Sequence, residues 1–379
     1  MSDDTHLFSL QRREKVMDEL RARGSVRVSE LARDFDVSEI TVRRDLLALA
    51  GQGLVTRVHG GATLTSPLEA NVLPGARAST SSPARFTIGM VVPSLSFYWP
   101  HVINGARAAA AAGRERIVLR GSSYDSRDDR TNILKLLATP GIHGLLLAPN
   151  TTDAGGPDLI RWLDTLKVPV VLVERRPPVG VHTQNLQWVA TDHAYGAGLA
   201  VRHLHAQGHR RIGLLLPAGS PHADQIKRGW RLTCQELGVP SGDELTGISA
   251  GFQDPGWAQV VSARMADIER TGTTAVIVHS DPEAIALLQL CADRGIRVPH
   301  DLAVVAYDDE VAAMAEPALT AVRPPKSHIG RVAVELLTAR MYEGRKRPLH
   351  HVVVDPELIV RDSSRVPRDA GARTRSLGT

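Results

Sequence analysis

The residues between Ser38 and Arg44 are grouped as contact with DNA would require. Ser38 is followed by Ile40, Thr41, Arg43 and Arg44. An exposed isoleucine beside a threonine and two arginines is unusual on a solvated surface. It suits a DNA groove, where aliphatic groups contact thymine methyls and arginine binds guanine or phosphate. Because serine is a preferred helix cap, Ser38 can start a helix that presents these side chains. We therefore expect a DNA-reading helix at this position.

The surrounding residues supply the elements that such a helix needs. On the predicted helix, Val42, Leu46 and Leu49 share one face at i, i+4 and i+7, opposite the polar side chains. The other expected elements are a first helix ending before Gly24, a second helix capped by Ser29, a third helix over 39–51, a strand over 54–58 and a wing tip at 59–61. Three short helices followed by a hairpin form a winged helix-turn-helix, which places one helix in the major groove.

Charge in this module is balanced. Residues 1–64 contain ten lysines and arginines and ten acidic residues, although the whole chain has a net charge of +4. DNA binding therefore depends on where the charges lie and not on their sum. Phosphate contacts should give one copy only modest affinity. We expect a homodimer that presents two modules to a double-stranded DNA operator.

The module closely resembles the N-terminal domain of DeoR-family bacterial repressors. The resemblance is carried by residues 38–46 (SEITVRRDL), by Gly53-Leu54 and by residues 57–62 (RVHGGA). It implies that Ser38, Thr41, Arg43 and Arg44 contact DNA and that Arg57 and His59 belong to the wing. The alternative is that this three-helix unit serves protein contact, as some winged helices do.

From Phe86 onward the pattern changes to short apolar strands that alternate with helices. The strands are expected at 86–92, 117–119, 143–149, 169–173, 211–216, 244–249, 275–278 and 302–306. This alternation predicts an α/β fold in which parallel sheets carry helices on both faces. The rhythm occurs twice, so we expect two lobes with a cleft between them.

This second part resembles the effector domain of LacI/GalR-family regulators, a periplasmic-binding-protein-like fold. The motifs are residues 192–197 (DHAYGA), 208–213 (GHRRIG), 280–284 (SDPEA), 295–302 (GIRVPHDL) and 317–320 (PALT). The resulting domains are a winged helix-turn-helix over 1–64, a flexible linker over 65–85, an effector domain over 86–362 and a basic, disordered tail over 363–379. Lobe 1 is expected at about 86–190 and 323–350, and lobe 2 at about 192–320 and 351–362.

Effector-binding residues are expected where strands end, because ligands of open α/β sheets bind beyond the carboxyl ends of the strands. The candidates are Phe97, Tyr98, Tyr124, Asn150, Glu174, Arg175, Asp192, Phe252 and Asp281. Aromatic faces could stack on a sugar ring. The resemblance further implies that Asp281 accepts ligand hydroxyls and that Phe252 lines the cleft. The family's usual arginine position is Ile226 here, so Arg175 or Arg176 would supply that donor instead.

Several classes of protein are disfavoured. No run approaches the ~20 apolar residues of a membrane span, and the N-terminus lacks a signal-peptide core, so a cytoplasmic location is expected. Cys234 and Cys291 lie far apart and predict buried free thiols. No nucleophile–base arrangement or phosphate loop indicates an enzyme, and no cofactor or metal is expected. An exported solute receptor would need a signal peptide and no DNA module.

Together these features predict a ligand-responsive transcription regulator. The expected role is repression of carbohydrate uptake or catabolism genes, with operator affinity controlled by a small sugar or sugar derivative bound between the lobes. Activation by the same architecture stays an alternative, and a solute-binding receptor is a weaker one.

Overall fold

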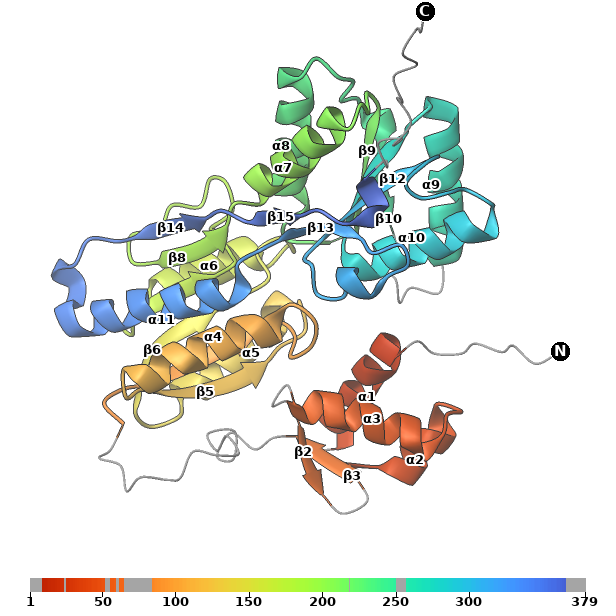
Figure 1. Ribbon diagram of the computed structural model, residues 1–379. Coiled ribbons are helices and arrows are strands. Elements are labelled where there is room, and N and C mark those ends of the chain that lie inside the picture. The colour runs from red at the N-terminus through yellow and green to blue at the C-terminus, as the bar shows by residue number, and fades with distance from the viewer. Residues whose placement is uncertain are drawn as a thin grey trace, which may run out of the picture.

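The computed structural model describes residues 9–23, 25–51, 55–58, 61–64, 84–217, 219–249 and 257–365. Figure 1 shows a small N-terminal domain and a larger two-lobed part. The predicted linker falls outside the described residues except for its last two positions. In the described part of the chain no helix is long and apolar enough to span a membrane.

The N-terminal domain packs three helices on a three-stranded sheet. Its elements are α1 (Ser9–Arg23), β1 (Ser25–Arg27), α2 (Val28–Asp34), α3 (Glu39–Gly51), β2 (Val55–Val58) and β3 (Gly61–Leu64). The strands run antiparallel in the order β1-β3-β2. The core includes Val16, Leu20, Val42, Leu46 and Leu49, as the helical spacing predicts. The winged helix-turn-helix plan is therefore present.

Strand β1 was not predicted, and its presence moves the start of the second helix. Ser25–Arg27 pair with β3, so Arg27 keeps an extended backbone and takes the cap position of α2 without a side-chain hydrogen bond. Ser29 consequently lies inside the first turn of α2, and its predicted capping role is wrong.

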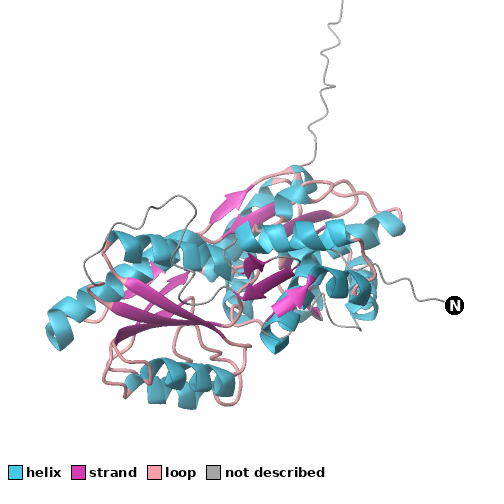
Figure 2. Ribbon diagram, turned by 90° about the horizontal axis from the view of Figure 1, so that it is seen from below, coloured by secondary structure: helices cyan, strands magenta, loops and turns pink. Residues whose placement is uncertain are grey.

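The first lobe is built on a six-stranded parallel sheet of order β14-β8-β7-β6-β4-β5. Its strands are β4 (Thr87–Val92), β5 (Arg116–Gly121), β6 (Ile142–Leu147), β7 (Val170–Val173), β8 (Gln187–Thr191) and β14 (His351–Val354). Helices α4 (Trp99–Ala112) and α11 (Lys326–Glu343) cover one face, and α5 (Ser126–Leu137) and α6 (Gly156–Asp164) cover the other. Figure 2 shows helices on both sides of such a sheet.

The second lobe repeats this plan with the order β10-β9-β11-β12-β13-β15. Its strands are β9 (Ile212–Pro217), β10 (Thr246–Ser249), β11 (Ala275–His279), β12 (Ala303–Tyr307), β13 (Thr320–Arg323) and β15 (Glu357–Ile359). Only β15 runs antiparallel to its neighbour. Helices α7 (His193–Ala206) and α8 (Ala223–Glu236) pack on one face, and α9 (Trp257–Thr271) and α10 (Asp281–Asp293) on the other.

The chain crosses between the lobes three times. The crossings follow β8 at Asp192, β13 at Pro324 and β14 at Asp355. One predicted boundary is wrong, because residues 351–354 pair with β8 in the first lobe and not with the second lobe. These residues precede the third crossing, so the lobe changes only between β14 and β15.

The C-terminal end of the described chain also differs from the prediction. Ser363 and Ser364 are fully buried, although residues 363–379 were assigned to a disordered tail. Ser363 Oγ donates to the Val304 carbonyl at 2.6 Å and accepts from the Thr320 N–H at 2.9 Å. These two serines therefore belong to the second lobe, and residues 366–379 lie outside the described part.

Helices α4 and α11 approach closely because each contributes a glycine at the contact. A Cβ on Gly105 would lie 1.9 Å from the Ser327 carbonyl oxygen, and one on Gly330 would lie 2.0 Å from the Val102 carbonyl oxygen. This close packing fixes the start of α11, which carries Lys326 to the junction of the lobes. Both cysteines are buried and free, as predicted.

Candidate functional site

Helix α3 presents the predicted DNA-reading face. Ser38 caps it by accepting the Thr41 N–H at 3.2 Å, and the two hydroxyl oxygens lie 2.8 Å apart. Ile40 is 76% exposed, while Val42 is fully buried. An aliphatic side chain this open to solvent at the start of a helix is available for a groove contact.

Arg43 and Arg44 are both exposed beside Ile40. The Arg43 Nη2 donates to Glu39 Oε2 at 3.0 Å, one turn earlier on the same helix. Exposed ion pairs of this kind contribute little, so phosphate or a base edge can replace the carboxylate at small cost. The structure therefore brings Ser38, Ile40, Thr41, Arg43 and Arg44 together on one surface.

A buried ion pair beneath this surface was not predicted. Asp45 is 4% exposed, and one of its oxygens lies 2.5 Å from the Arg12 Nε of α1. Arg13 approaches the other oxygen at 3.8 Å. The pair fixes α3 against α1, so it positions the helix that is predicted to read DNA. Its two partners lie 33 residues apart, and no local pattern marks them.

The wing is described only in part. Arg57 lies on β2 opposite Ala62, and His59 falls outside the described residues. Gly61 at the start of β3 must be a glycine, because a Cβ there would lie 2.0 Å from the Val26 carbonyl oxygen of β1. The pairing of β3 with β1 thus explains why this position of the sequence motif is a glycine.

At the junction of the lobes, several strands end in residues with left-handed backbone. Phe97, Tyr124 and Glu174 in the first lobe have φ values of 57°, 50° and 56°, and Asp308 and Asp309 in the second have 96° and 52°. Such a conformation costs a non-glycine residue roughly 1–3 kcal/mol and tends to occur at functional sites. Backbone strain is therefore concentrated at the strand ends where effector contacts were predicted.

Among the predicted effector residues that the structure describes, Tyr124 is the most open, at 47% exposed. Its hydroxyl lies 3.4 Å from the indole Nε1 of Trp99, and its carbonyl accepts the Asn150 amide at 2.6 Å. The Asn150 oxygen accepts both the N–H and the hydroxyl of Thr152. Tyr124 and the partly buried Phe97 can contact a ligand, whereas the Asn150 amide orients the loop.

Glu174 and Tyr98 form part of a buried polar network. The Tyr98 hydroxyl donates to Glu174 Oε1 at 2.6 Å, and the Thr191 hydroxyl donates to the same oxygen at 2.7 Å. Glu174 is 1% exposed, with His193 Nε2 3.7 Å from its other oxygen. Burial alone would raise the pKa of Glu174, but His193 and these hydrogen bonds lower it. Both residues therefore join the first lobe to the start of α7 and are not free for a ligand.

Arg175 spans the two lobes. Its Nη1 lies 3.1 Å from Nε2 of His222, which follows β9 in the second lobe, and its Nε donates to the Pro149 carbonyl at 3.1 Å. The guanidinium also lies 5.4 Å from the centre of the Trp99 ring. Burial, followed by the charges of His193 and Arg175, lowers the pKa of His222 well below its ordinary value. The Nε2 of a neutral His222 can accept a hydrogen bond from the Arg175 guanidinium.

His279 and Asp308 form a second pair that was not predicted. His279 ends β11, and its Nε2 lies 3.5 Å from Asp308 Oδ2 at the end of β12. Burial would lower the pKa of His279, but the Asp308 carboxylate raises it. His222 follows β9 and His279 ends β11, so the strand-end rule that selected Phe252 and Asp281 in this lobe could also have selected these two histidines.

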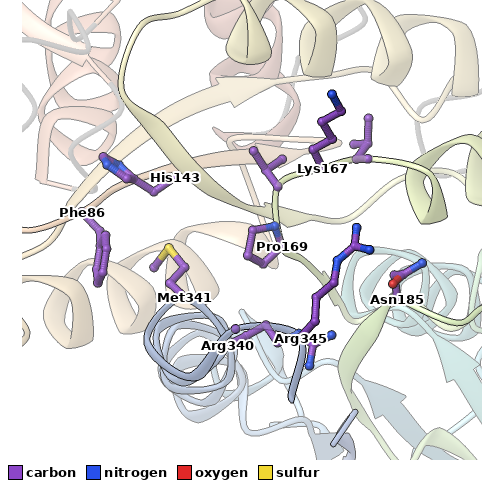
Figure 3. A pocket seen from close by; sticks show the side chains of 11 residues that line it. Phe86, His143, Lys167, Pro169, Asn185, Arg340, Met341 and Arg345 are labelled. Carbon is purple, nitrogen blue, oxygen red and sulfur yellow. The ribbon is translucent and has the colours of Figure 1, made fainter. Parts of the chain in front are cut away.

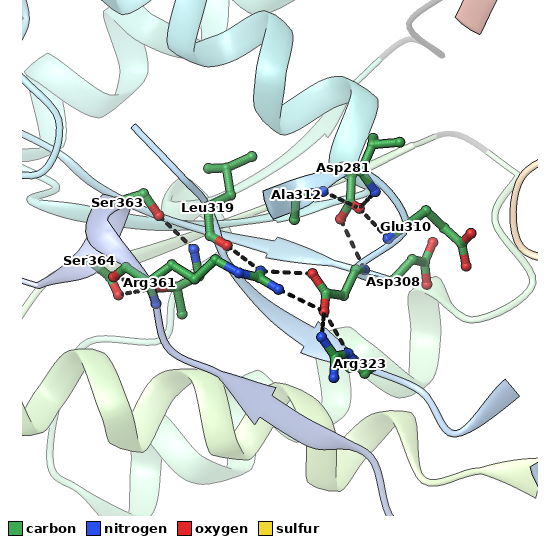
Figure 4. A network of polar contacts seen from close by, with 12 residues as sticks. Asp281, Asp308, Glu310, Ala312, Leu319, Arg323, Arg361, Ser363 and Ser364 are labelled. Carbon is green, nitrogen blue, oxygen red and sulfur yellow. Dashed lines mark hydrogen bonds and ion pairs between the residues drawn. The ribbon is translucent and has the colours of Figure 1, made fainter. Parts of the chain in front are cut away.

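Asp281 occupies a different environment from the one predicted. It is fully buried, and its oxygens accept backbone N–H groups of Asp309, Glu310, Val311 and Ala312 at 2.6–3.2 Å. Figure 4 shows these bonds. Burial raises the pKa of Asp281 to about 7 while the backbone donors oppose the rise. The predicted role as an acceptor of ligand hydroxyls requires oxygens that this arrangement already uses.

The loop that Asp281 holds is also anchored from outside. Asp309 accepts from Arg361 and Arg323 at 2.7 and 2.6 Å. Both arginines are labelled in Figure 4. Asp308, the neighbour of Asp309, points to His279 instead, so the two adjacent carboxylates do not form a pair. Asp192 caps α7 by accepting the Tyr195 N–H at 2.9 Å, and Phe252 lies outside the described residues.

Further ion pairs close the junction of the lobes. Lys326 at the start of α11 pairs with Glu310 at 2.5 Å and donates to the Asp308 carbonyl. His101 of α4 lies 3.4 Å from the other Glu310 oxygen. Ile226 is buried in the core of the second lobe, so no donor reaches the junction from that position. Glu310 is therefore approached by Lys326 and His101 from two helices of the opposite lobe.

Known proteins match both parts of the chain. Residues 12–67 match the DeoR-like helix-turn-helix domain, and residues 201–364 match the periplasmic binding protein-like domain. The arabinose metabolism transcriptional repressor of Geobacillus stearothermophilus is 27% identical over 343 residues, which cover 89% of this chain and 90% of that protein. The HTH-type transcriptional regulator CelR of Thermobifida fusca is 29% identical over 339 residues, covering 84% and 96%.

A solved structure described as the transcriptional regulator CelR–cellobiose complex is also similar. It has a TM-score of 0.63 and 25% sequence identity, covering 86% of this chain and 91% of that one. Both resemblances predicted from the sequence are confirmed by these matches, as is the two-sheet α/β fold.

Proposed function

We propose that the chain is a bacterial transcription regulator in which a DeoR-like helix-turn-helix is joined to a LacI-type periplasmic-binding-protein-like domain, and that it represses carbohydrate genes in response to a sugar. In this proposal, α3 reads a double-stranded operator and a small sugar or sugar derivative binds between the lobes. Two copies act together as a homodimer.

The observation that carries the proposal is the surface of α3. Ile40, Arg43 and Arg44 are exposed on a helix whose opposite face is buried against α1 and α2. Exposure to solvent does not favour an isoleucine at this position, so its presence indicates a contact with another molecule. A major groove offers both the thymine methyls and the guanine or phosphate acceptors that these side chains fit.

The proposed effector surface is formed by strand ends of both lobes. Tyr124 and Phe97 offer apolar faces, and Arg175 with His222 offers polar edges from opposite lobes. A sugar has an apolar ring face and hydroxyls that donate and accept hydrogen bonds, so it complements this combination of apolar and polar side chains. The relatives named for arabinose metabolism and for a cellobiose complex support a carbohydrate ligand.

The proposed mechanism is a population shift between lobe arrangements. The pairs Arg175–His222 and Lys326–Glu310 join the lobes in the described arrangement. An effector that inserts between them and replaces these contacts changes the relative stability of closed and open forms. In a dimer, that change moves the two reading helices relative to each other and alters operator affinity.

The test combines DNA selection with ligand screening on the full chain. Genomic fragments selected by the protein should converge on a repeated half-site, and a panel of monosaccharides and disaccharides should contain one that raises the melting temperature. The same sugar should change operator affinity. A matched variant, Arg43→Ala with Arg44→Ala, should lose operator binding and keep the sugar-induced shift. Selection without any common sequence, or equal operator affinity in that variant, would refute the proposal.

A further inference from the structure

A pocket opens in the first lobe at the end of the sheet opposite to the proposed effector surface. It lies at the amino ends of β4, β6 and β7, and its volume is about 240 Å³. Phe86, His143, Lys167, Arg340, Met341 and Arg345 are among the residues that line it. Phe86 directly precedes β4, where the chain enters the lobe from the N-terminal domain. The pocket is therefore separate from the effector surface and adjacent to the connection with the DNA-reading module.

Three cationic side chains line this pocket without partners of opposite charge. Lys167, Arg340 and Arg345 have no ion pair among the described residues, and no residue that lines the pocket is acidic. Other arginines nearby are paired in the usual way, such as Arg331 with Glu335 and Arg347 with Glu343. The pocket therefore carries positive charge that the described protein does not neutralise.

Arg340 is the strongest element of this site. It is only 8% exposed, and its Nη1 donates a hydrogen bond to the Arg347 carbonyl. A guanidinium has five N–H donors, and burying one without an anion is costly. The nearby Asp164 does not supply that anion, because its oxygens accept the backbone N–H groups of Gln184 and Asn185 at 2.7–3.1 Å.

The other end of the pocket is apolar and aromatic. Figure 3 shows Phe86, His143 and Met341 at one end, with Arg340, Arg345 and Asn185 at the other. The Phe86 ring lies edge-on to His143, with centroids 5.4 Å apart. His143 Nδ1 accepts the Thr87 N–H at 3.1 Å, so in the neutral ring Nε2 carries the proton and can donate. The pocket thus suits a small molecule with an anionic head and a carbon body.

We propose that this pocket is a second ligand site, which binds a small phosphate monoester. The phosphate binds Arg340, Arg345 and Lys167, and the carbon body contacts Phe86 and Met341. Three cationic groups suit a dianion better than a single carboxylate, and arginine binds phosphate oxygens in a bidentate way. Binding would fix Phe86, the residue that directly precedes β4.

The test is calorimetric titration of the full chain with sn-glycerol 3-phosphate, inorganic phosphate and, as a neutral control, glycerol. Both phosphates should bind at one site per chain with an affinity that falls with added salt, and glycerol should not bind. Arg340→Gln should weaken binding at least about tenfold. Because Arg340 is buried, the double variant Lys167→Gln with Arg345→Gln, which changes only exposed residues, provides the same test without a risk to folding.

Two control variants locate the site. Lys346→Gln changes an exposed cation beside Arg345 that does not line the pocket, and it should bind phosphate as the wild type does. Arg43→Ala with Arg44→Ala should also leave phosphate binding unchanged, so this result separates the pocket from the DNA-reading helix. The site does not depend on the proposed function, because neither DNA nor a sugar enters these measurements.

Three outcomes would overturn the proposal. The first is a lack of saturation by about 10 mM of either phosphate. The second is equal phosphate affinity in the wild type and in the Lys167→Gln, Arg345→Gln variant. The third is stronger binding of D-glycerate than of glycerol 3-phosphate, which would assign the pocket to carboxylates.

Discussion

Arg175 of the first lobe and His222 of the second lobe contact each other directly, with 3.1 Å between Nη1 of the guanidinium and Nε2 of the imidazole. The His222 ring also lies 4.0 Å from the ring of His193, centroid to centroid. His193 in turn approaches Glu174, so a continuous polar network joins the lobes. A ligand that enters between the lobes must compete with this network or extend it.

The protonation state of His222 should make the stability of the protein sensitive to mild acid. Its pKa is lowered first by burial and then by the charges of His193 and Arg175, whereas in the unfolded chain a histidine titrates near 6.5. Stability that depends on neutral His222 is therefore present above pH ~6.5 and is lost as the pH falls towards the folded pKa. Between pH 7 and 5.5 we therefore expect the free energy of unfolding to fall as the pH is lowered.

The measurement is the free energy of unfolding of wild type and His222→Gln at several pH values in that range. The variant should lose less stability than the wild type on acidification, while His300→Gln, which changes an exposed histidine, should follow the wild type. Identical pH profiles for wild type and His222→Gln would contradict the assignment of a neutral, buried imidazole.

Arg44 should contribute directly to operator recognition. If it binds a base edge in a bidentate way, Arg44→Ala should weaken specific binding by ~1–3 kcal/mol and relax the preference at one base pair. If it binds phosphate, all sequences should weaken alike and the dependence on salt should become less steep. Titration of operator and scrambled DNA at two salt concentrations distinguishes these cases. Operator affinity that survives the loss of both Arg43 and Arg44 would exclude α3 as the reading helix.

Asp45 should control operator binding without touching DNA. Asp45→Asn keeps the shape of the side chain but removes the charge that pairs with Arg12, and breaking a buried pair typically costs about 3–5 kcal/mol. We expect faster hydrogen exchange in α1 and α3 and weaker binding to all DNA sequences. Asp34→Asn is the matched control, because Asp34 is exposed and its pairing with Arg33 should contribute under about 1 kcal/mol. Wild-type exchange rates in Asp45→Asn would disprove the positioning role.

Asp281 should act on the effector surface through the loop that it holds. Asp281→Asn puts an NH₂ donor in place of one of the two oxygens that together accept four backbone N–H groups, so we expect a loss of about 2–4 kcal/mol in the stability of the second lobe. Effector affinity should fall as a consequence. Asp293→Asn on the exposed side of the same helix should change neither quantity. Calorimetry and thermal unfolding of both variants test this, and reduced affinity with an unchanged melting temperature would restore the direct ligand contact.

Much of the architecture could be predicted because its signals are local. The cap at Ser38 and the spacing of Val42, Leu46 and Leu49 lie within a few turns of one helix, so the sequence alone identifies the buried and exposed faces of α3. Apolar strands alternating with helices likewise imply parallel sheets, since each strand must be covered on both sides. Short strands such as β1 and β14 carry no such signal, because their three or four residues become strands only by pairing with a distant partner.

The identity of the site residues was decided by the tertiary structure. From sequence, Glu174, Arg175 and Asp281 are polar residues at strand ends and are equal candidates for ligand contact. The fold gives each of them protein partners, and it brings His222 and His279 to the same junction. A polar side chain is free for a ligand only if no other buried group needs it, and that depends on contacts between residues far apart in the chain. The sequence therefore determined the two domain types and the exposed face of α3 that we propose reads DNA. Only the packing of one lobe against the other decided which polar groups remain available to an effector.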